Sequence, residues 1–125
     1  MCGRQAVYSI KIESYFSSAH SLRGYKGKCE DLHGHNWKIE VSLESAKLDK
    51  TGLLLDFHEL KNKLNSVLEK LDHKYLNKLA YFKKINPTSE NIAKFIYTSL
   101  KPKVKYLKSV TVWESHNSSA SYYER

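Results

Sequence analysis

The sequence predicts an α+β domain in which two helices cover an antiparallel sheet. Apolar and polar residues alternate near both ends of the chain, which is the period of β-strands. Between these ends, two stretches carry apolar residues at the three- and four-residue spacing of amphipathic helices. The predicted order is therefore ββααββ. With 125 residues, 41% of them hydrophobic, we expect one folded domain over residues 1–125.

The first two strands form a predicted hairpin. Apolar and polar residues alternate over residues 7–16 and again over residues 37–43, so each segment has one buried face. Residues 23–28, which are rich in glycine and lysine, separate the strands and lead to Cys29. We therefore expect the two strands to be joined by a loop that carries this cysteine.

The first helix is expected to begin after Asp56, which can cap its N-terminus, with Glu59 in its first turn. Its end is expected near Leu71. The apolar stripe of this helix consists of Phe57, Leu60, Leu64, Val67, Leu68 and Leu71. This spacing indicates one buried face.

The second helix is expected after residues 86–90, where a proline, a threonine or serine cap and a glutamate follow one another. Pro102 is expected to end it. The apolar stripe of this helix consists of Ile92, Phe95, Ile96 and Leu100.

The third strand is expected over residues 110–113, with Glu114 at its end. A turn at residues 116–118 leads to a fourth strand at residues 120–123. An open sheet of four strands leaves its edge strands unpaired, so pairing with other subunits is expected.

The charge of the chain favours an anionic partner. Lys and Arg outnumber Asp and Glu by 21 to 13, for a net charge of +8. Such a partner could be nucleic acid, a membrane surface or a phosphorylated small molecule. The basic residues are spread along the chain without a nucleic-acid-binding motif, which makes a nucleic-acid-binding module the weaker interpretation.

The cysteines and the apolar runs indicate a reduced, soluble protein. Cys2 and Cys29 are the two cysteines, and Cys2 lies at the N-terminus, so we expect no disulfide and a cytoplasmic location. The N-terminus lacks the apolar region of a signal peptide, and the longest aliphatic run, residues 53–55, is too short to span a bilayer. No membrane partner is expected.

Three histidines near the hairpin are candidate metal ligands. His33 and His35 are two residues apart, so in extended chain their imidazoles point to the same side. His20 lies near the other end of the same connection. Three imidazoles would bind Zn²⁺ and leave a fourth position for water or substrate. The alternative is an exposed loop that happens to carry histidines.

Four further residues are candidates for catalysis or binding, each with a structural alternative. Cys29 is a base or nucleophile beside a metal-bound substrate, or a plain surface thiol. Asp72 and His73 form a proton relay, or an exposed turn. Glu114 binds a nitrogenous ligand through paired hydrogen bonds, or ends a strand in solvent. His58 and His116 are interpreted as surface residues.

A set of short motifs in a fixed order extends over nearly the whole chain. It consists of Phe16-Ser17-Ser18-Ala19-His20, Cys29 with His33-Gly34-His35-Asn36, Leu55-Asp56-Phe57, Leu71-Asp72-His73-Lys74-Tyr75-Leu76-Asn77, Asn86-Pro87-Thr88-Ser89-Glu90-Asn91-Ile92-Ala93 and Trp113-Glu114-Ser115. In this order the motifs resemble the 6-pyruvoyl-tetrahydropterin synthase family. Within that family, the chain is most similar to the 6-carboxy-tetrahydropterin synthases of queuosine biosynthesis.

The resemblance implies a fold, an assembly and a set of roles. The fold is the T-fold, in which the sheets of three subunits close a barrel, commonly stacked as a hexamer with active sites at subunit interfaces. By similarity His20, His33 and His35 bind zinc and Cys29 is the catalytic base. Asp72 and His73 relay protons, approaching Cys29 from a neighbouring chain. By similarity, too, Glu114 anchors the pterin ring.

The resemblance also implies a reaction. A zinc-dependent lyase of this kind converts 7,8-dihydroneopterin triphosphate to 6-carboxytetrahydropterin, releasing acetaldehyde and triphosphate. The short spacing between Cys29 and His33 is typical of the carboxy-forming branch. Synthesis of 6-pyruvoyl-tetrahydropterin is the alternative activity, and a zinc-bound T-fold protein without catalysis is another. Arg23, Lys26 and Lys28 are candidates for binding the triphosphate.

Overall fold

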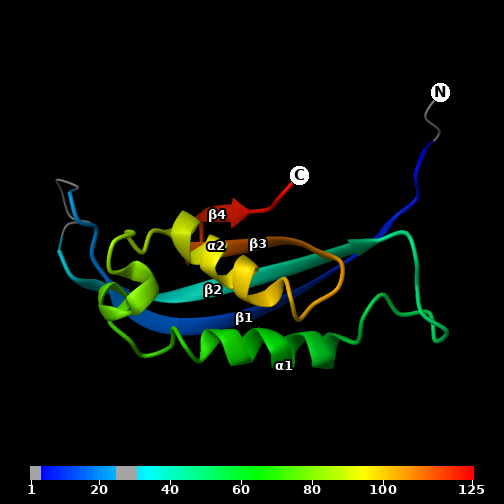
Figure 1. Ribbon diagram of the computed structural model, residues 1–125, viewed down its shortest axis with the longest axis horizontal. Coiled ribbons are helices and arrows are strands. Elements are labelled where there is room, and N and C mark those ends of the chain that lie inside the picture. Colours follow the sequence, from blue (N-terminus) through cyan, green and yellow to red (C-terminus); the bar gives the residue numbers. More distant parts are fainter. Residues whose placement is uncertain (1–3, 25–30) are drawn as a thin grey trace.

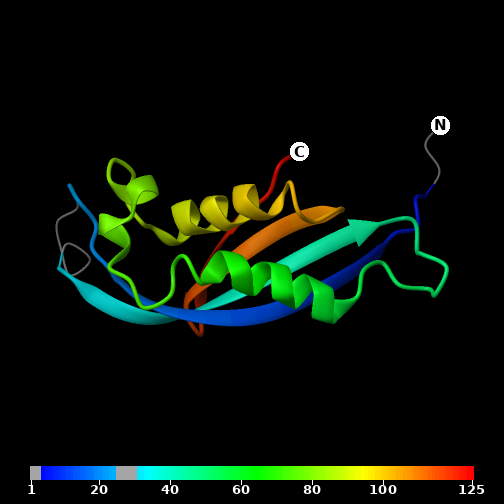
Figure 2. The same cartoon turned by 60° about the horizontal axis from the view of Figure 1, so that its bottom comes forward.

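The four strands form one antiparallel sheet with the strands in sequence order, covered on one face by two helices (Figures 1 and 2). The structure, a computed structural model, describes residues 4–24 and 31–125. The strands are β1 (Tyr8–His20), β2 (His33–Ser45), β3 (Leu107–Ser115) and β4 (Ser118–Tyr122), and the helices are α1 (Phe57–Leu68) and α2 (Ser89–Leu100). The predicted α+β class and the order ββααββ are confirmed.

The first two strands reach further toward their connection than the apolar alternation predicted. β1 continues beyond Phe16 to His20, and β2 begins at His33, directly opposite His20 in the register. Residues 17–19 are small and polar or weakly apolar, so the alternating pattern ends there although the backbone stays extended. The predicted loop histidines are therefore strand residues.

The core lies between the sheet and the helices. Trp37 is its largest fully buried side chain, and it stacks on Phe16 with ring centroids 5.9 Å apart. The helices contribute Leu60, Leu64, Val67 and Leu68 from α1, and Ile92, Ala93, Ile96, Tyr97 and Leu100 from α2. Burial of these stripes is the main stabilisation of the helices on the sheet.

The helix starts were predicted well and one helix end was not. Asp56 caps α1 by accepting a hydrogen bond from the His58 N–H at 2.8 Å, and Thr88 caps α2 in the same way. The first helix ends at Leu68 and not at Leu71, because i→i+3 hydrogen bonds tighten the chain beyond it. Two 3₁₀ helices that were not predicted, η2 (Leu76–Lys78) and η3 (Ala80–Phe82), lie between α1 and α2.

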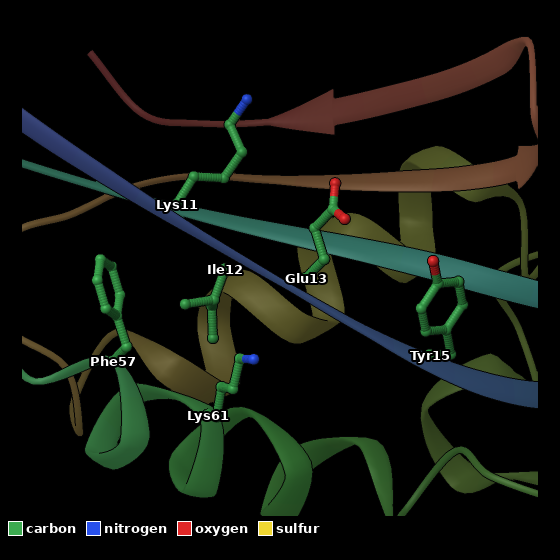
Figure 3. A pocket seen from close by; sticks show the side chains of 6 residues that line it. All are labelled: Lys11, Ile12, Glu13, Tyr15, Phe57 and Lys61. Atoms are coloured by element: carbon green, nitrogen blue, oxygen red, sulfur yellow. The ribbon is translucent and has the colours of Figure 1, made fainter.

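The free edge of the sheet at β1 borders a hollow between this strand and α1 (Figure 3). The hollow has a volume of about 530 Å³ and is lined by Lys11, Ile12, Glu13, Tyr15, Phe57 and Lys61. The Tyr15 and Phe57 residues that border it are 64% and 53% exposed. Large aromatic side chains thus stand beside an unpaired strand edge.

Among the described residues, no helix is long and apolar enough to cross a membrane.

Replacing Leu64 by Ala should lower the free energy of unfolding by about 2–5 kcal/mol, because Leu64 is fully buried and its loss leaves a cavity. Leu53, which is 44% exposed, is the matched control, and its replacement by Ala should change stability by less than about 0.5 kcal/mol. Urea unfolding at equal protein concentration measures both variants. Equal losses in the two variants would contradict the assignment of α1 to the core.

Candidate metal centre

Three adjacent strands bring four side chains together at one end of the sheet. His20 comes from β1, His33 and His35 from β2, and Glu114 from β3. One nitrogen or oxygen atom from each of these residues lies within 4.8 Å of those of the others. The expectation that the three histidines meet at one end of the hairpin is confirmed.

Backbone carbonyls fix the orientation of two of the imidazole rings. His20 Nδ1 lies 2.7 Å from the carbonyl oxygen of Pro87, and His33 Nδ1 lies 2.7 Å from that of Asp31. Since a carbonyl oxygen can only accept, the proton of each neutral ring is on Nδ1. The Nε2 lone pair of each ring is then free to bind a metal, and this arrangement is common around metal-bound histidines.

The residues present fit a divalent metal ion. His20 Nε2 is buried and has no hydrogen-bond partner among the described residues. A buried acceptor without a partner is costly, and a cation at the centre of the cluster would satisfy it. Three imidazole nitrogens with a nearby carboxylate are a donor set that binds divalent transition metals.

Burial favours the neutral form of two imidazoles in the cluster. It lowers the pKa of His20 and of His35, because the charged imidazolium loses hydration inside the protein. The hydrogen bond to Pro87 opposes this effect at His20, and the charge of Glu114 opposes it at both rings. The lowered pKa favours the neutral imidazole at pH 7, which is the form that binds metals.

The Glu114 carboxylate lies beside the histidines and is only partly exposed to solvent. One carboxylate oxygen, Oε1, lies 3.0 Å from His35 Nε2 and 4.0 Å from His20 Nε2, while Oε2 accepts a hydrogen bond from the Ser89 hydroxyl at 3.1 Å. The side chain is one-third exposed. It can therefore complete the coordination of a metal or bind a ligand that enters beside one.

Asp72 and His73 contact each other although they are adjacent in sequence. Asp72 Oδ2 lies 2.9 Å from His73 Nδ1, and Asp72 Oδ1 accepts a hydrogen bond from the Ser17 N–H at 2.9 Å. His73 has the left-handed backbone φ of 54°, in a bend that lets the two neighbouring side chains turn toward each other. The Ser17 hydrogen bond, followed by contact with His73, lowers the pKa of Asp72.

The Asp72–His73 pair lies beside the metal cluster, not within it. An open hollow of about 420 Å³ is lined by His73 and Lys74 together with residues 17–19 of β1 and 34–36 of β2. The His73 side chain is 81% exposed. His73 thus lines the same hollow as His35, one of the candidate metal ligands.

The remaining candidates are divided between described and undescribed residues. Cys29, Lys26 and Lys28 lie outside the described residues. Arg23 donates from one guanidinium nitrogen to the backbone carbonyls of Asn77 and Phe82, at 3.1 and 2.7 Å, and its role in binding triphosphate stays a prediction. His58 and His116 are exposed, as expected for surface residues.

The family model described as 6-pyruvoyl tetrahydropterin synthase matches residues 9–125, a range that contains every residue of the cluster. The chain belongs to this family. The predicted T-fold is also confirmed by a solved structure of a family member, 6-pyruvoyl tetrahydropterin synthase from Caenorhabditis elegans. That structure has a TM-score of 0.86 and 29% identity, and the match covers 99% of this chain and 100% of that one.

The curated relatives of this chain carry more than one name. The chain is 41% identical to a putative 6-carboxy-5,6,7,8-tetrahydropterin synthase of Archaeoglobus fulgidus, over 86% of this chain and 89% of that one. It is 38% identical to the 6-carboxy-5,6,7,8-tetrahydropterin synthase of Synechocystis, over 94% of each chain. It is also 38% identical to the 6-pyruvoyl tetrahydrobiopterin synthase of Dictyostelium discoideum, over 86% and 89%.

Sequence reasoning missed two groups that hold side chains of this cluster in place. The Pro87 carbonyl holds His20, and the Ser89 hydroxyl holds Glu114. A backbone carbonyl has no side-chain signature, and Ser89 was interpreted only as a possible helix cap. Pro87 and Ser89 lie just before and at the first residue of α2, which packs on β3. Their position at this helix start is the feature that could have identified them.

The carboxyl group of Asp72 should titrate below its ordinary value of 3.8, because the Ser17 N–H stabilises the charged form. Carbon-detected NMR over a pH series measures this, and the Asp72→Asn variant identifies the resonance. A carboxyl pKa that is lower in the folded state stabilises the fold above the unfolded pKa, and this stabilisation is lost as pH falls through the folded value. A midpoint at or above the ordinary value would contradict the hydrogen bond.

Proposed function

We propose that this chain is a zinc-dependent 6-carboxy-5,6,7,8-tetrahydropterin synthase of queuosine biosynthesis. It would convert 7,8-dihydroneopterin triphosphate to 6-carboxytetrahydropterin, with release of acetaldehyde and triphosphate. The observation that carries the proposal is the convergence of His20, His33 and His35 in a chain of this family. The names of two relatives, at 41% and 38% identity, support the carboxy-forming activity, as does the short spacing between Cys29 and His33.

The three histidines would hold the zinc ion through their Nε2 atoms. A bound zinc ion supplies Lewis-acid polarisation of substrate oxygens, which makes the neighbouring carbon-bound protons easier to remove. The carbonyls of Pro87 and Asp31 keep two of the rings in the binding orientation. No rearrangement of these ligands is then required when substrate enters.

The other candidates would divide substrate binding and proton transfer among them. Glu114 accepts hydrogen bonds from the ring N–H and amino groups of the pterin, and Ser89 holds its second oxygen in place. Cys29 removes and returns protons at the substrate carbons as the general base. Asp72 keeps the proton of neutral His73 on Nδ1, which leaves Nε2 able to accept a proton.

We also propose that the protein works as a trimer or hexamer with active sites between subunits. The free edge of β1 with exposed Tyr15, and the neighbouring exposed Phe57, are suited to pairing with another chain (Figure 3). The 81% exposed side chain of His73 could then face the Cys29 loop of a neighbour. A cytoplasmic location and the absence of a nucleic-acid or membrane partner stay predictions.

Synthesis of 6-pyruvoyl-tetrahydropterin is the second candidate, because a relative with that activity in its name is 38% identical. The two activities share substrate and metal and differ in the product. Cleavage of the side chain releases acetaldehyde only in the first.

Purified protein incubated with 7,8-dihydroneopterin triphosphate should yield 6-carboxytetrahydropterin and acetaldehyde, measured by mass spectrometry. A chelator should abolish turnover, and added Zn²⁺ should restore it, because the metal polarises the substrate. A pyruvoyl product without acetaldehyde would favour the second candidate. If the protein binds zinc but does not convert the substrate, it is a T-fold protein without this catalytic activity.

The two cysteines provide a matched pair of variants for the same assay. Cys29→Ala should lower turnover by about 10²–10⁴-fold, as expected for loss of a general base, with zinc content unchanged. Cys2→Ala should retain the activity of the wild type. Full activity in Cys29→Ala would contradict the role of this thiol as the base.

A further inference from the structure

The outer edge of β1 near the histidines has an unusual set of hydrogen-bond partners. Ser17 bonds through its N–H to the Asp72 carboxylate and through its carbonyl to the His73 N–H. Ala19 donates its N–H to the Lys74 carbonyl at 3.0 Å. The segment after α1 therefore takes the place of a neighbouring strand along this part of β1.

Two asparagine side chains continue this edge beyond the end of the strand. Asn77 accepts from the Ser21 N–H at 2.9 Å and donates to the Ser21 carbonyl at 2.8 Å. Asn86 does the same with Arg23, with both distances 2.9 Å. A side-chain amide that bonds both backbone groups of one residue reproduces the paired bonds of an antiparallel ladder.

These amides are themselves held in place. Asn77 is only 8% exposed, and its carbonyl accepts from the Arg23 guanidinium at 3.1 Å. The Asn86 carbonyl accepts from the Asn91 side chain at 2.9 Å, which joins it to the first turn of α2. Asn86 is thus held through α2, and Asn77 is held by its burial in η2 and by Arg23.

The metal ligand His20 lies directly before the residues that these amides bind. Its imidazole is held by Pro87, which follows Asn86 in the chain. The same short segment therefore fixes the ring of His20 through one carbonyl and the backbone beyond it through one side-chain amide. Without these bonds, the backbone groups of Ser21 and Arg23 would lose their amide partners, and the chain that follows His20 would be held less firmly.

We propose that Asn77 and Asn86 are positioning residues for the metal ligand His20. They act on the metal through the backbone of Ser21 and Arg23 and do not bind it. Groups that orient a metal ligand typically change affinity by about 10–100-fold when they are removed. The proposal rests on the metal centre of the proposed function, and it adds two residues to the groups that determine its affinity.

The test measures the Zn²⁺ affinity of Asn77→Ala and Asn86→Ala by competition with a chromophoric chelator, at a temperature where circular dichroism shows each variant folded. Each should bind Zn²⁺ at least about tenfold more weakly than the wild type. Asn65→Ala is the matched control, because the exposed Asn65 side chain also bonds β1, at Ser14, six residues before His20. This variant should keep the affinity of the wild type.

Wild-type affinity in both folded variants would overturn the proposal and leave the metal centre intact. A wild-type protein that does not bind Zn²⁺ would contradict the metal centre, and with it this role of the asparagines. If Asn77→Ala does not fold, the Zn²⁺ affinity of Asn86→Ala decides the test, because Asn86 is only half-buried. Asn86→Asp keeps the acceptor for the Arg23 N–H and loses the donor, so its affinity should lie between those of wild type and Asn86→Ala.

Discussion

The register between β1 and β2 is the constraint on which the site depends. His20 lies opposite His33, and Ser18 lies opposite His35, so both strands present their histidines on the face covered by the helices. Because side chains alternate along a strand, a slip of one residue would turn the histidines of one strand to the other face. The core prevents such a slip, since Trp37 continues the same face of β2 and is fully buried. The histidine cluster is thus a continuation of the hydrophobic core.

Burial favours the neutral form of the imidazoles in the cluster, and it also has a cost in free energy. The ring of Trp37 packs against His20 and His35, with centroids 4.9 and 5.0 Å away. This apolar contact excludes water and favours neutral imidazoles, which lack a charge that must be hydrated. It also leaves His20 Nε2 buried without a partner among the described residues, a cost that a bound cation would offset. His73 is exposed and His20 is buried, which is consistent with the different tasks proposed for them, proton transfer and metal binding.

Much of this arrangement could be predicted from the sequence. The alternation over residues 37–43 gave the second strand, and the same alternation extended back places His33 and His35 on its buried face. Val110, Val112 and Glu114 follow one another at two-residue spacing in β3, so their side chains share one face. This spacing would likewise have placed Glu114 toward the helices. The extension of β1 to His20 could not be predicted, because residues 17–19 carry no apolar alternation and their partners on the outer edge, residues 72–74, are distant in sequence. Neither could the two asparagine amides, whose role depends on three-dimensional position and not on a local pattern.

In the proposed metal centre, three histidines bind the metal and Cys29 stays outside its coordination. X-ray absorption at the zinc edge, on protein loaded with one equivalent of Zn²⁺, tests it directly. For three histidine ligands we expect imidazole nitrogens at about 2.0–2.1 Å from zinc, with one or more oxygens and no sulfur. A sulfur neighbour at about 2.3 Å would contradict it, because Cys29 would then be a ligand and could not serve as the free base.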